Sequence, residues 1–281
     1  MRILSLIDDL TATDRLAAEH GSAIYIEYGG KKILFDTGAS DKVIVNAERM
    51  LLDLGKLDAV VISHNHTGHI GGLAHLLAKF PSLTIYAKRA AANDFYKGAA
   101  FFRFRMSESA AFFKRYADNF VLFENFQEIF PGLYLMTDES ADGSHRPDNR
   151  RFFEKESGKF KRDEFKHEVF MLLMRTQDEK DGCVVISPCS HLGVPECLET
   201  ARLNFPHSPI RGTVAGFRLS VGGKKLTVKR DFLESNARRV ADLTNYTVYA
   251  CHSAGKLGYE ALKPMMGDQL QYLRAGEEII F

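Results

Sequence analysis

Three histidines within six residues, His64, His66 and His69, place the strongest constraint on this chain. They follow the short apolar run Asp58–Ile62, which is β-branched and predicts a buried strand. Two glycines and then the segment Leu73–Phe80, which predicts a helix, come after them. A strand-to-helix turn can aim several side chains at one point, and imidazole is a common ligand for transition metals. The pattern therefore predicts a metal site at this turn.

A histidine follows the end of a predicted strand at two further places. The strand predicted over 182–186 leads to His191, and the strand predicted over 246–251 leads to His252. Small residues follow each of these histidines, as they do at the first turn. Three such turns are hard to explain as chance, which supports the metal interpretation.

Strands and helices alternate along most of the sequence, which predicts a layered α/β fold. Apolar patterning and turn residues indicate strands at 2–7, 22–28, 32–35, 58–62, 83–87, 168–174, 182–186, 211–215 and 246–251. Helices are expected at 41–54 with Gly55 as its cap, at 73–80, from about Lys88, at 195–203 and at 231–243.

Composition excludes several classes of protein. The 281 residues are 45% hydrophobic and 26% charged, and the net charge is +1, so no overall charge favours nucleic acid or membrane surfaces. No apolar run approaches the roughly 20 residues that a membrane helix needs, and the first residues read as a strand rather than a signal peptide. The four cysteines form no CxxC pair and predict reduced thiols. We expect a cytoplasmic protein.

Residues 98–167 interrupt the alternation and are expected to form an inserted cap or lid. Aromatic and basic residues interleave there, and the stretch 145–166 holds eight Lys/Arg against five Asp/Glu. A basic, aromatic cap suits a small anionic, partly planar substrate, such as a phosphorylated or pterin-like molecule. A packing surface or the interface of a homo-oligomer explains the same pattern equally well.

Six motifs in chain order resemble those of the metallo-β-lactamase superfamily. They are Glu19-His20-Gly21, Asp36-Thr37-Gly38, His64-x-His66-x-x-His69-x-Gly71-Gly72, Cys189-Ser190-His191-x-Gly193, Gly216-Phe217-x-Leu219 and His252-Ser253-x-Gly255. Within the superfamily the order is similar to the 7,8-dihydropterin-6-methyl-4-(β-D-ribofuranosyl)aminobenzene-5′-phosphate synthase-like branch. The resemblance implies a single domain over 1–281, an αββα sandwich with an inserted cap region and one or two divalent transition-metal ions. Zinc is the first expectation, and iron and manganese are the alternatives.

The resemblance also implies roles for particular residues. His64, His66 and His191 would hold a first metal, and His69 and His252 would belong to a second. Asp36 would accept a hydrogen bond from a liganding imidazole. His20 would lie near the site, as a substrate contact, in proton transfer or as a structural turn residue.

Two positions depart from the family pattern. Gly68 stands where the superfamily motif has an aspartate that binds the second metal. Arg218 stands where relatives often carry another histidine. We hypothesise that Arg218 points toward the vacated second site and supplies positive charge to a phosphate group; a salt-bridged surface arginine is the alternative.

The leading interpretation is a hydrolase that acts on a small anionic, phosphorylated substrate through a metal-bound hydroxide. A pterin-related synthase or transferase, and a binding or sensor protein with a degenerate site, are the alternatives. Nucleic acid and membrane are not expected as partners.

Overall fold

The computed structural model describes residues 1–99, 102–147, 149–221 and 225–281. The chain separates into two compact units, and each is described by itself. The first unit comprises Met1–Glu124, Arg151–Glu168 and Arg274–Ile280. The second comprises Asn125–Arg150, Val169–Leu273 and Phe281. The expectation of one domain over 1–281 stays a prediction.

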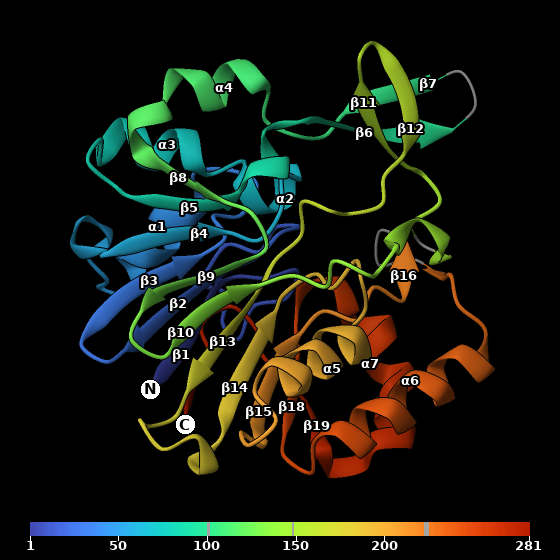
Figure 1. The fold of residues 1–281 in the computed structure, drawn as a ribbon. Helices are drawn as coiled ribbons and strands as arrows, with labels where there is room; N and C mark the ends of the chain where they lie inside the picture. The colour runs from blue at the N-terminus through green and yellow to red at the C-terminus, as the bar shows by residue number, and fades with distance from the viewer. Residues whose placement is uncertain (100–101, 148, 222–224) are drawn as a thin grey trace. The chain divides into compact units, whose positions relative to one another are not determined.

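The first unit is built on a seven-stranded sheet of order β20-β1-β2-β3-β4-β5-β8 (Figure 1). Its strands are β1 (Arg2–Ile7), β2 (Ala23–Tyr28), β3 (Lys31–Phe35), β4 (Ala59–Ile62), β5 (Ile85–Lys88), β8 (Phe120–Phe123) and β20 (Glu278–Ile280). β2 and β3 form an antiparallel hairpin, because Gly29 and Gly30 both take positive φ (55° and 77°), which a tight two-residue turn requires. From β3 to β8 the strands run parallel.

Helices α1 (Lys42–Arg49), α2 (Thr67–Ile70), α3 (Leu73–Lys79) and α4 (Ala110–Arg115) belong to the first unit. Apolar residues of α1, α3 and α4 pack with those of the strands in one buried cluster that includes Val43, Leu76 and Phe113. All four residues of β4 are buried, as a continuous apolar run in a parallel strand predicts. The predicted strand at 58–62 and helix at 73–80 are therefore confirmed.

A small antiparallel sheet of order β12-β11-β6-β7 completes the first unit. Its strands are β6 (Asp94–Ala99), β7 (Phe102–Arg105), β11 (Phe152–Glu156) and β12 (Lys159–Arg162). The expected cap at 98–167 thus divides among several sheets, because β8 joins the large sheet of this unit and β9 and β10 join the sheet of the second unit. Residues 100, 101 and 148 of that stretch lie outside the described residues. The role of a lid stays a prediction.

The second unit has its own seven-stranded sheet of order β19-β18-β15-β14-β13-β10-β9. The strands are β9 (Phe126–Phe130), β10 (Leu133–Met136), β13 (Phe170–Met174), β14 (Cys183–Ser187), β15 (Ile210–Ala215), β18 (Val248–Ala250) and β19 (Leu270–Tyr272). From β14 to β19 they run parallel. A short ribbon pairs β16 (Ser220–Val221) with β17 (Lys225–Leu226).

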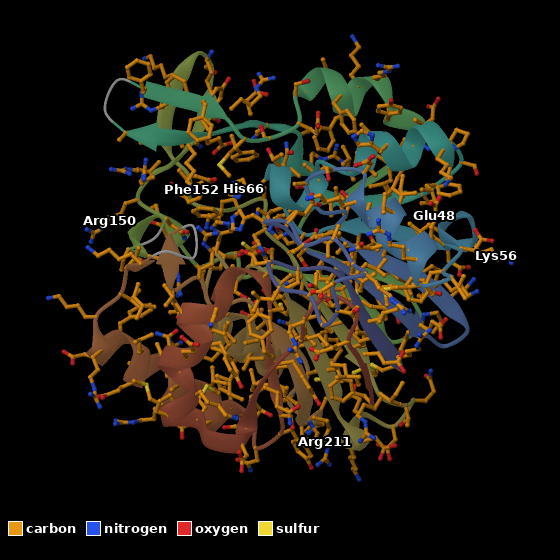
Figure 2. The ribbon with its side chains drawn as sticks, turned by 180° about the vertical axis from the view of Figure 1, so that it is seen from behind. Glu48, Lys56, His66, Arg150, Phe152 and Arg211 are labelled. Atoms are coloured by element: carbon orange, nitrogen blue, oxygen red, sulfur yellow. The ribbon has the colours of Figure 1, made fainter. Side chains whose placement is uncertain are left out.

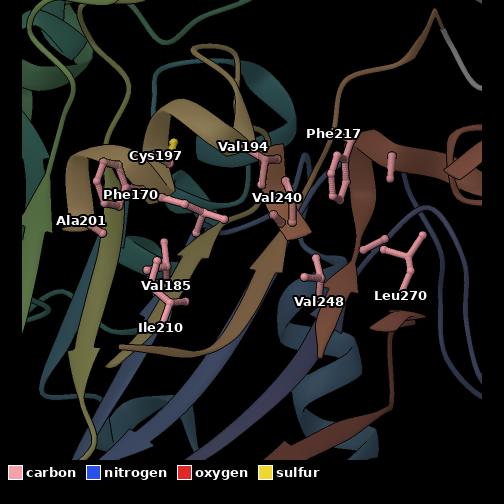
Figure 3. Close-up of a cluster of buried hydrophobic side chains, with 14 of the residues drawn as sticks. Phe170, Val185, Val194, Cys197, Ala201, Ile210, Phe217, Val240, Val248 and Leu270 are labelled. Carbon is pink, nitrogen blue, oxygen red and sulfur yellow. The ribbon is translucent and has the colours of Figure 1, made fainter. Parts of the chain in front are cut away.

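Helices α5 (Val194–Asn204), α6 (Arg230–Leu243) and α7 (Gly255–Met266) pack on this sheet through one buried apolar cluster. Figure 3 shows its side chains, with Val194 and Cys197 of α5 and Val240 of α6 near Val185 and Val248 of the strands. Burial of this kind contributes roughly 25 cal/mol for each Å² of apolar surface removed from water. This buried cluster holds the helices against the parallel strands β14, β15 and β18, after whose carboxyl ends His191, Arg218 and His252 lie.

Two local expectations are wrong, and one helix was missed. The helix predicted over 41–54 ends at Arg49, so Gly55 lies in a separate 3₁₀ turn (Leu54–Lys56) and does not cap it. The helix expected from Lys88 is a 3₁₀ turn (Arg89–Ala92) that leads into β6. Helix α7, which contains Pro264, was not expected.

Among the residues that the structure describes, no helix has the length and apolar character needed to cross a membrane.

Candidate metal centre

Asp36 lies at the carboxyl end of β3, and the histidine turn follows the neighbouring parallel strand β4. Because parallel strands end at the same edge of a sheet, the two segments meet there. Three donors converge on the buried Asp36 carboxylate. Its Oδ1 accepts from the Ser63 backbone N–H at 2.7 Å, and its Oδ2 accepts from the Ser63 hydroxyl at 2.8 Å and from His69 Nδ1 at 2.6 Å.

These bonds determine which ring nitrogen of two histidines carries the proton. A carboxylate accepts only, so His69 donates from Nδ1 to Asp36. The Ser63 hydroxyl gives its single proton to Asp36 and therefore accepts from His64 Nδ1, which lies 2.9 Å away. In both neutral rings the lone pair is then on Nε2, one of the two ring nitrogens through which histidine binds a metal.

The loop after Asp36 is tied to the histidine turn and to the motif around His20. The Thr37 backbone N–H and hydroxyl both donate to the His69 carbonyl, at 2.7 and 2.9 Å. Glu19 accepts from Ala39 N–H at 2.8 Å and from the Ser40 hydroxyl at 2.6 Å. Through these hydrogen bonds Glu19 stabilises the loop after Asp36, and this loop is in turn bonded to the histidine turn.

The backbone of residues 20–22 passes close to Gly68, which explains why a residue without a side chain stands at this position of the motif. The Ser22 N–H donates to the Gly68 carbonyl at 3.0 Å. A Cβ added at Gly68 would lie 3.0 Å from the His20 carbonyl oxygen, and one added at Gly21 would lie 2.4 Å from the Gly68 oxygen. The space beside Gly68 is thus narrowed by the segment 20–21, and an aspartate there would require that segment to shift.

His66 faces a pair of residues that the sequence analysis missed. Asp163 and His167 come from the segment after β12, and Asp163 Oδ2 lies 3.8 Å from His66 Nε2 and 3.2 Å from His167 Nε2. Burial raises the pKa of the Asp163 carboxyl, but the adjacent His167 and His66 rings outweigh burial and lower that pKa below its usual range. A buried, ionised carboxylate therefore lies beside the turn. The sequence signal was an Asp and a His four residues apart, where the basic stretch 145–166 ends.

In the second unit, His191, Arg218 and His252 follow the carboxyl ends of the adjacent parallel strands β14, β15 and β18. Arg218 and His252 have positive φ values of 45° and 29°, and Asp36 of the first unit has 64°. Residues other than glycine rarely adopt this left-handed conformation, and it is concentrated at functional sites. The backbone conformation is thus a second indication, independent of side-chain chemistry, that these three residues belong to a functional site.

The imidazole of His191 is oriented like those of His64 and His69. Its Nδ1 lies 2.8 Å from Asn149 Oδ1, and the Asn149 Nδ2 donates to the carbonyls of Gly143 and His191. Because the amide nitrogen is committed to two carbonyls, the amide oxygen faces the ring and accepts from Nδ1. The lone pair of the neutral His191 ring is therefore on Nε2. Asn149 was not expected from the sequence.

Arg218 is half-buried, and its Nη1 donates to the Cys189 sulfur at 3.5 Å. Cys189 lies two residues before His191, and its carbonyl accepts from the Ser253 hydroxyl at 2.8 Å. Arg218 therefore reaches the turn that carries His191 and does not extend into solvent.

The His20 side chain is exposed, and its Nδ1 lies 2.9 Å from Asp9 Oδ2. Its backbone carbonyl, not its ring, approaches Gly68. A role for this ring in substrate contact or proton transfer stays a prediction.

Comparison with known proteins identifies the family to which the chain belongs. Residues 16–160, more than half of the chain, match the metallo-β-lactamase superfamily, and the chain belongs to this superfamily. The uncharacterized protein MJ0448 of Methanocaldococcus jannaschii is 23% identical over 233 residues, which is 77% of this chain and 79% of that protein. The 7,8-dihydropterin-6-methyl-4-(β-D-ribofuranosyl)-aminobenzene-5′-phosphate synthase of the same organism is 20% identical over 217 residues, covering 72% of this chain and 71% of the synthase.

A solved structure described as Tm1679, a metal-dependent hydrolase of the β-lactamase superfamily, is similar over the whole chain. The TM-score is 0.82 at 25% identity, with 100% of this chain and 99% of that chain covered. The metallo-β-lactamase fold expected from the histidine pattern is confirmed, as is a distant relationship to the pterin synthase branch. The chain is a hydrolase of the metallo-β-lactamase superfamily, whose members bind divalent metals.

The donor set fits such a metal. His64, His69 and His191 each have Nδ1 directed at a buried acceptor and the lone pair on Nε2. His64, His66 and His69 lie together in the first unit, and His191 and His252 belong to the second. A shell shared by residues of both units stays a prediction.

Proposed function

We propose that this protein hydrolyses a small anionic, phosphorylated substrate at a centre of one or two divalent transition-metal ions. The observation that carries the proposal is the orientation of three imidazoles by Asp36, Ser63 and Asn149, which leaves each Nε2 able to bind a cation. Purely structural histidines have no need of this shared tautomer.

Under this proposal His64, His66 and His191 hold the first metal, and His69 and His252 contribute to the second. Three imidazoles leave a coordination position open, which is typical of catalytic rather than structural sites. Zinc, iron and manganese all accept such ligands. A divalent ion held there supplies a Lewis acid for a phosphoryl oxygen and lowers the pKa of a water molecule.

Two residues of the chain act beside that centre. Asp36 holds the proton of His69 at Nδ1 and, through Ser63, that of His64, so the ring orientation is set before substrate arrives. Arg218 contributes a planar, permanently charged group at the end of β15, which can bind two phosphate oxygens at once. Where the second site holds no ion, the charge is suitable, because one arginine carries the same net charge as the missing carboxylate and divalent cation together.

Replacement of Arg218 tests the proposed substrate class. With bis(p-nitrophenyl) phosphate, Arg218→Ala is expected to raise KM by about 10- to 100-fold, because a hydrogen bond to a charged group contributes about 1.5–3 kcal/mol. Arg218→Lys retains the positive charge but not the planar guanidinium that binds two oxygens at once, so its KM should lie between those of the wild type and Arg218→Ala. Steady-state kinetics on metal-loaded protein measures both.

The neutral ester p-nitrophenyl acetate is the control substrate, and its hydrolysis should change little. An equal loss for both esters would mean that Arg218 supports the site without binding phosphate. Failure of the metal-loaded wild-type protein to cleave any phosphate ester would contradict the proposed substrate class itself.

A second candidate activity rests on the similarity to the pterin synthase. That relative is a synthase by name, so a related transfer reaction on a pterin substrate is the alternative to hydrolysis. Incubation with a dihydropterin that carries a phosphate-ester leaving group on its 6-methyl carbon and with 4-(β-D-ribofuranosyl)aminobenzene 5′-phosphate as the amine acceptor, followed by mass spectrometry, would distinguish condensation from simple hydrolysis.

A further inference from the structure

His66 differs from the other histidines of its turn in the partner that its ring faces. For His64 and His69 the contact lies at Nδ1, toward Ser63 and Asp36. For His66 the carboxylate of Asp163 lies on the Nε2 side, at 3.8 Å. A carboxylate at this distance attracts an N–H even without a full hydrogen bond, so the proton of a neutral ring is favoured on Nε2.

The Asp163 carboxylate is itself fixed in place. Its Oδ1 accepts from the Phe165 backbone N–H at 2.7 Å, while its Oδ2 is the atom that faces His167 and His66. Asp163 is 1% exposed, and so is His167. A buried charge held on both oxygens has one orientation available, so it can impose an orientation on its neighbours.

His167 connects this carboxylate to the backbone of the histidine turn. The Asn65 backbone N–H, between His64 and His66, donates to His167 Nδ1 at 3.2 Å. His167 Nδ1 therefore holds a lone pair, and its Nε2 carries the proton that is donated to Asp163. A metal at His167 would need that Nε2 lone pair, so the ring is a linker and not a ligand, although His66, Asp163 and His167 lie close enough to enclose an ion.

Aromatic rings hold both imidazoles at fixed angles. His66 stacks on Phe152 of β11, with ring centroids 5.0 Å apart and planes at 16°, and Figure 2 shows these two labelled side chains next to each other. His167 stacks on Phe95 of β6 at 3.7 Å and 17°. The small sheet thus restrains the two rings whose polar atoms face Asp163.

We infer that Asp163 and His167 are positioning residues that fix the His66 ring with its Nε2–H toward Asp163 and its Nδ1 toward the metal. The histidine turn has Gly68 where the superfamily motif has an aspartate, and Asp163, from the segment after β12, places a carboxylate beside the same turn. The inference deepens the proposed function and rests on it, because it concerns a ligand of the same centre.

Asp163→Asn tests the inference with little change of shape. The amide can keep one oxygen toward Phe165, but its NH₂ group then faces two ring N–H groups that need an acceptor. We expect the same number of metal ions per chain as in the wild type, with the affinity measured by chelator competition reduced about 10- to 100-fold, the usual effect of losing an oriented partner of a ligand. Asp94→Asn is the matched control, because Asp94 lies in β6 of the small sheet, whose strand β12 precedes Asp163, and pairs with Arg105. It should retain wild-type affinity.

A spectrum of the wild-type protein tests the same inference without any variant. In zinc-loaded protein with ¹⁵N-labelled histidine, long-range ¹H–¹⁵N correlations should show the proton of His66 on Nε2 and those of His64 and His69 on Nδ1. A proton on Nδ1 of His66 would overturn the inference, as would unchanged metal affinity in Asp163→Asn. Loss of one whole metal equivalent from that variant would make Asp163 a ligand and would also overturn it. Absence of metal from the wild-type protein would instead contradict the proposed function.

Discussion

Asp36→Asn is expected to weaken metal binding strongly while leaving the shape of the side chain almost unchanged. An amide can offer its oxygen to the Ser63 backbone N–H, but its NH₂ group would then face the Ser63 hydroxyl and His69 Nδ1, both of which donate to Asp36 in the wild type. His69 would have to accept at Nδ1, and the reversed Ser63 hydroxyl would donate to His64 Nδ1. Both rings would then carry their proton on Nε2, the atom that is needed for the metal.

The expected effect on the first metal is a loss of up to about 100-fold in affinity, since one of its ligands, His64, loses an oriented partner and such a partner is typically worth 10- to 100-fold. Binding of a second metal would weaken in the same way through His69. Asparagine tolerates the positive φ of this position, so backbone strain does not confuse the result. Asp58→Asn is the control, because Asp58 is exposed and precedes the opposite end of β4. Chelator competition at pH 7 measures the affinity, and equal affinities for the two variants would refute the assigned role of Asp36.

The second large effect is expected from loss of a first-metal ligand. His64→Ala and His191→Ala should each lower the turnover of a phosphate ester by about 10³-fold, which corresponds to the several kcal/mol that a catalytic metal contributes. The two residues belong to different units of the chain, so equal losses would support one shared shell.

His75→Ala is the matched control for these variants. His75 lies on the exposed face of α3 and should be replaceable without loss of metal or activity. A loss in His64→Ala with wild-type turnover in His191→Ala would exclude His191 from the shell and leave the first unit as the sole source of its ligands.

The parts of the site that could be predicted are those encoded by neighbours in sequence. The apolar run of β4, the glycines after the histidines and the strand-turn-histidine pattern at His191 and His252 are local signals. In the structure the run forms β4, and the histidines follow the ends of β4, β14 and β18. The Asp36 turn was predictable for the same reason, with the added family motif. Its hydrogen bonds to Ser63 and His69 follow from the pairing of β3 with β4.

Asp163, His167 and Asn149 could not be predicted because their partners are distant in sequence. His167 contacts the backbone of Asn65 across 102 positions, and Asn149 contacts His191 across 42. Nothing local distinguishes an aspartate that orients a histidine from one that is solvated. The early end of the helix at Arg49 was missed because the apolar spacing continues to Leu54, although Leu51 takes a positive φ of 58° that no helix can continue.

The most direct test of the account is the metal content of the wild-type chain, measured by elemental analysis after purification without a metal-affinity tag. The account predicts about one tightly held transition-metal ion per chain, since the second site lacks the carboxylate that Gly68 replaces. Protein that contains no metal, even after growth in metal-supplemented medium, would contradict it, because the oriented imidazoles would then have no cation to bind.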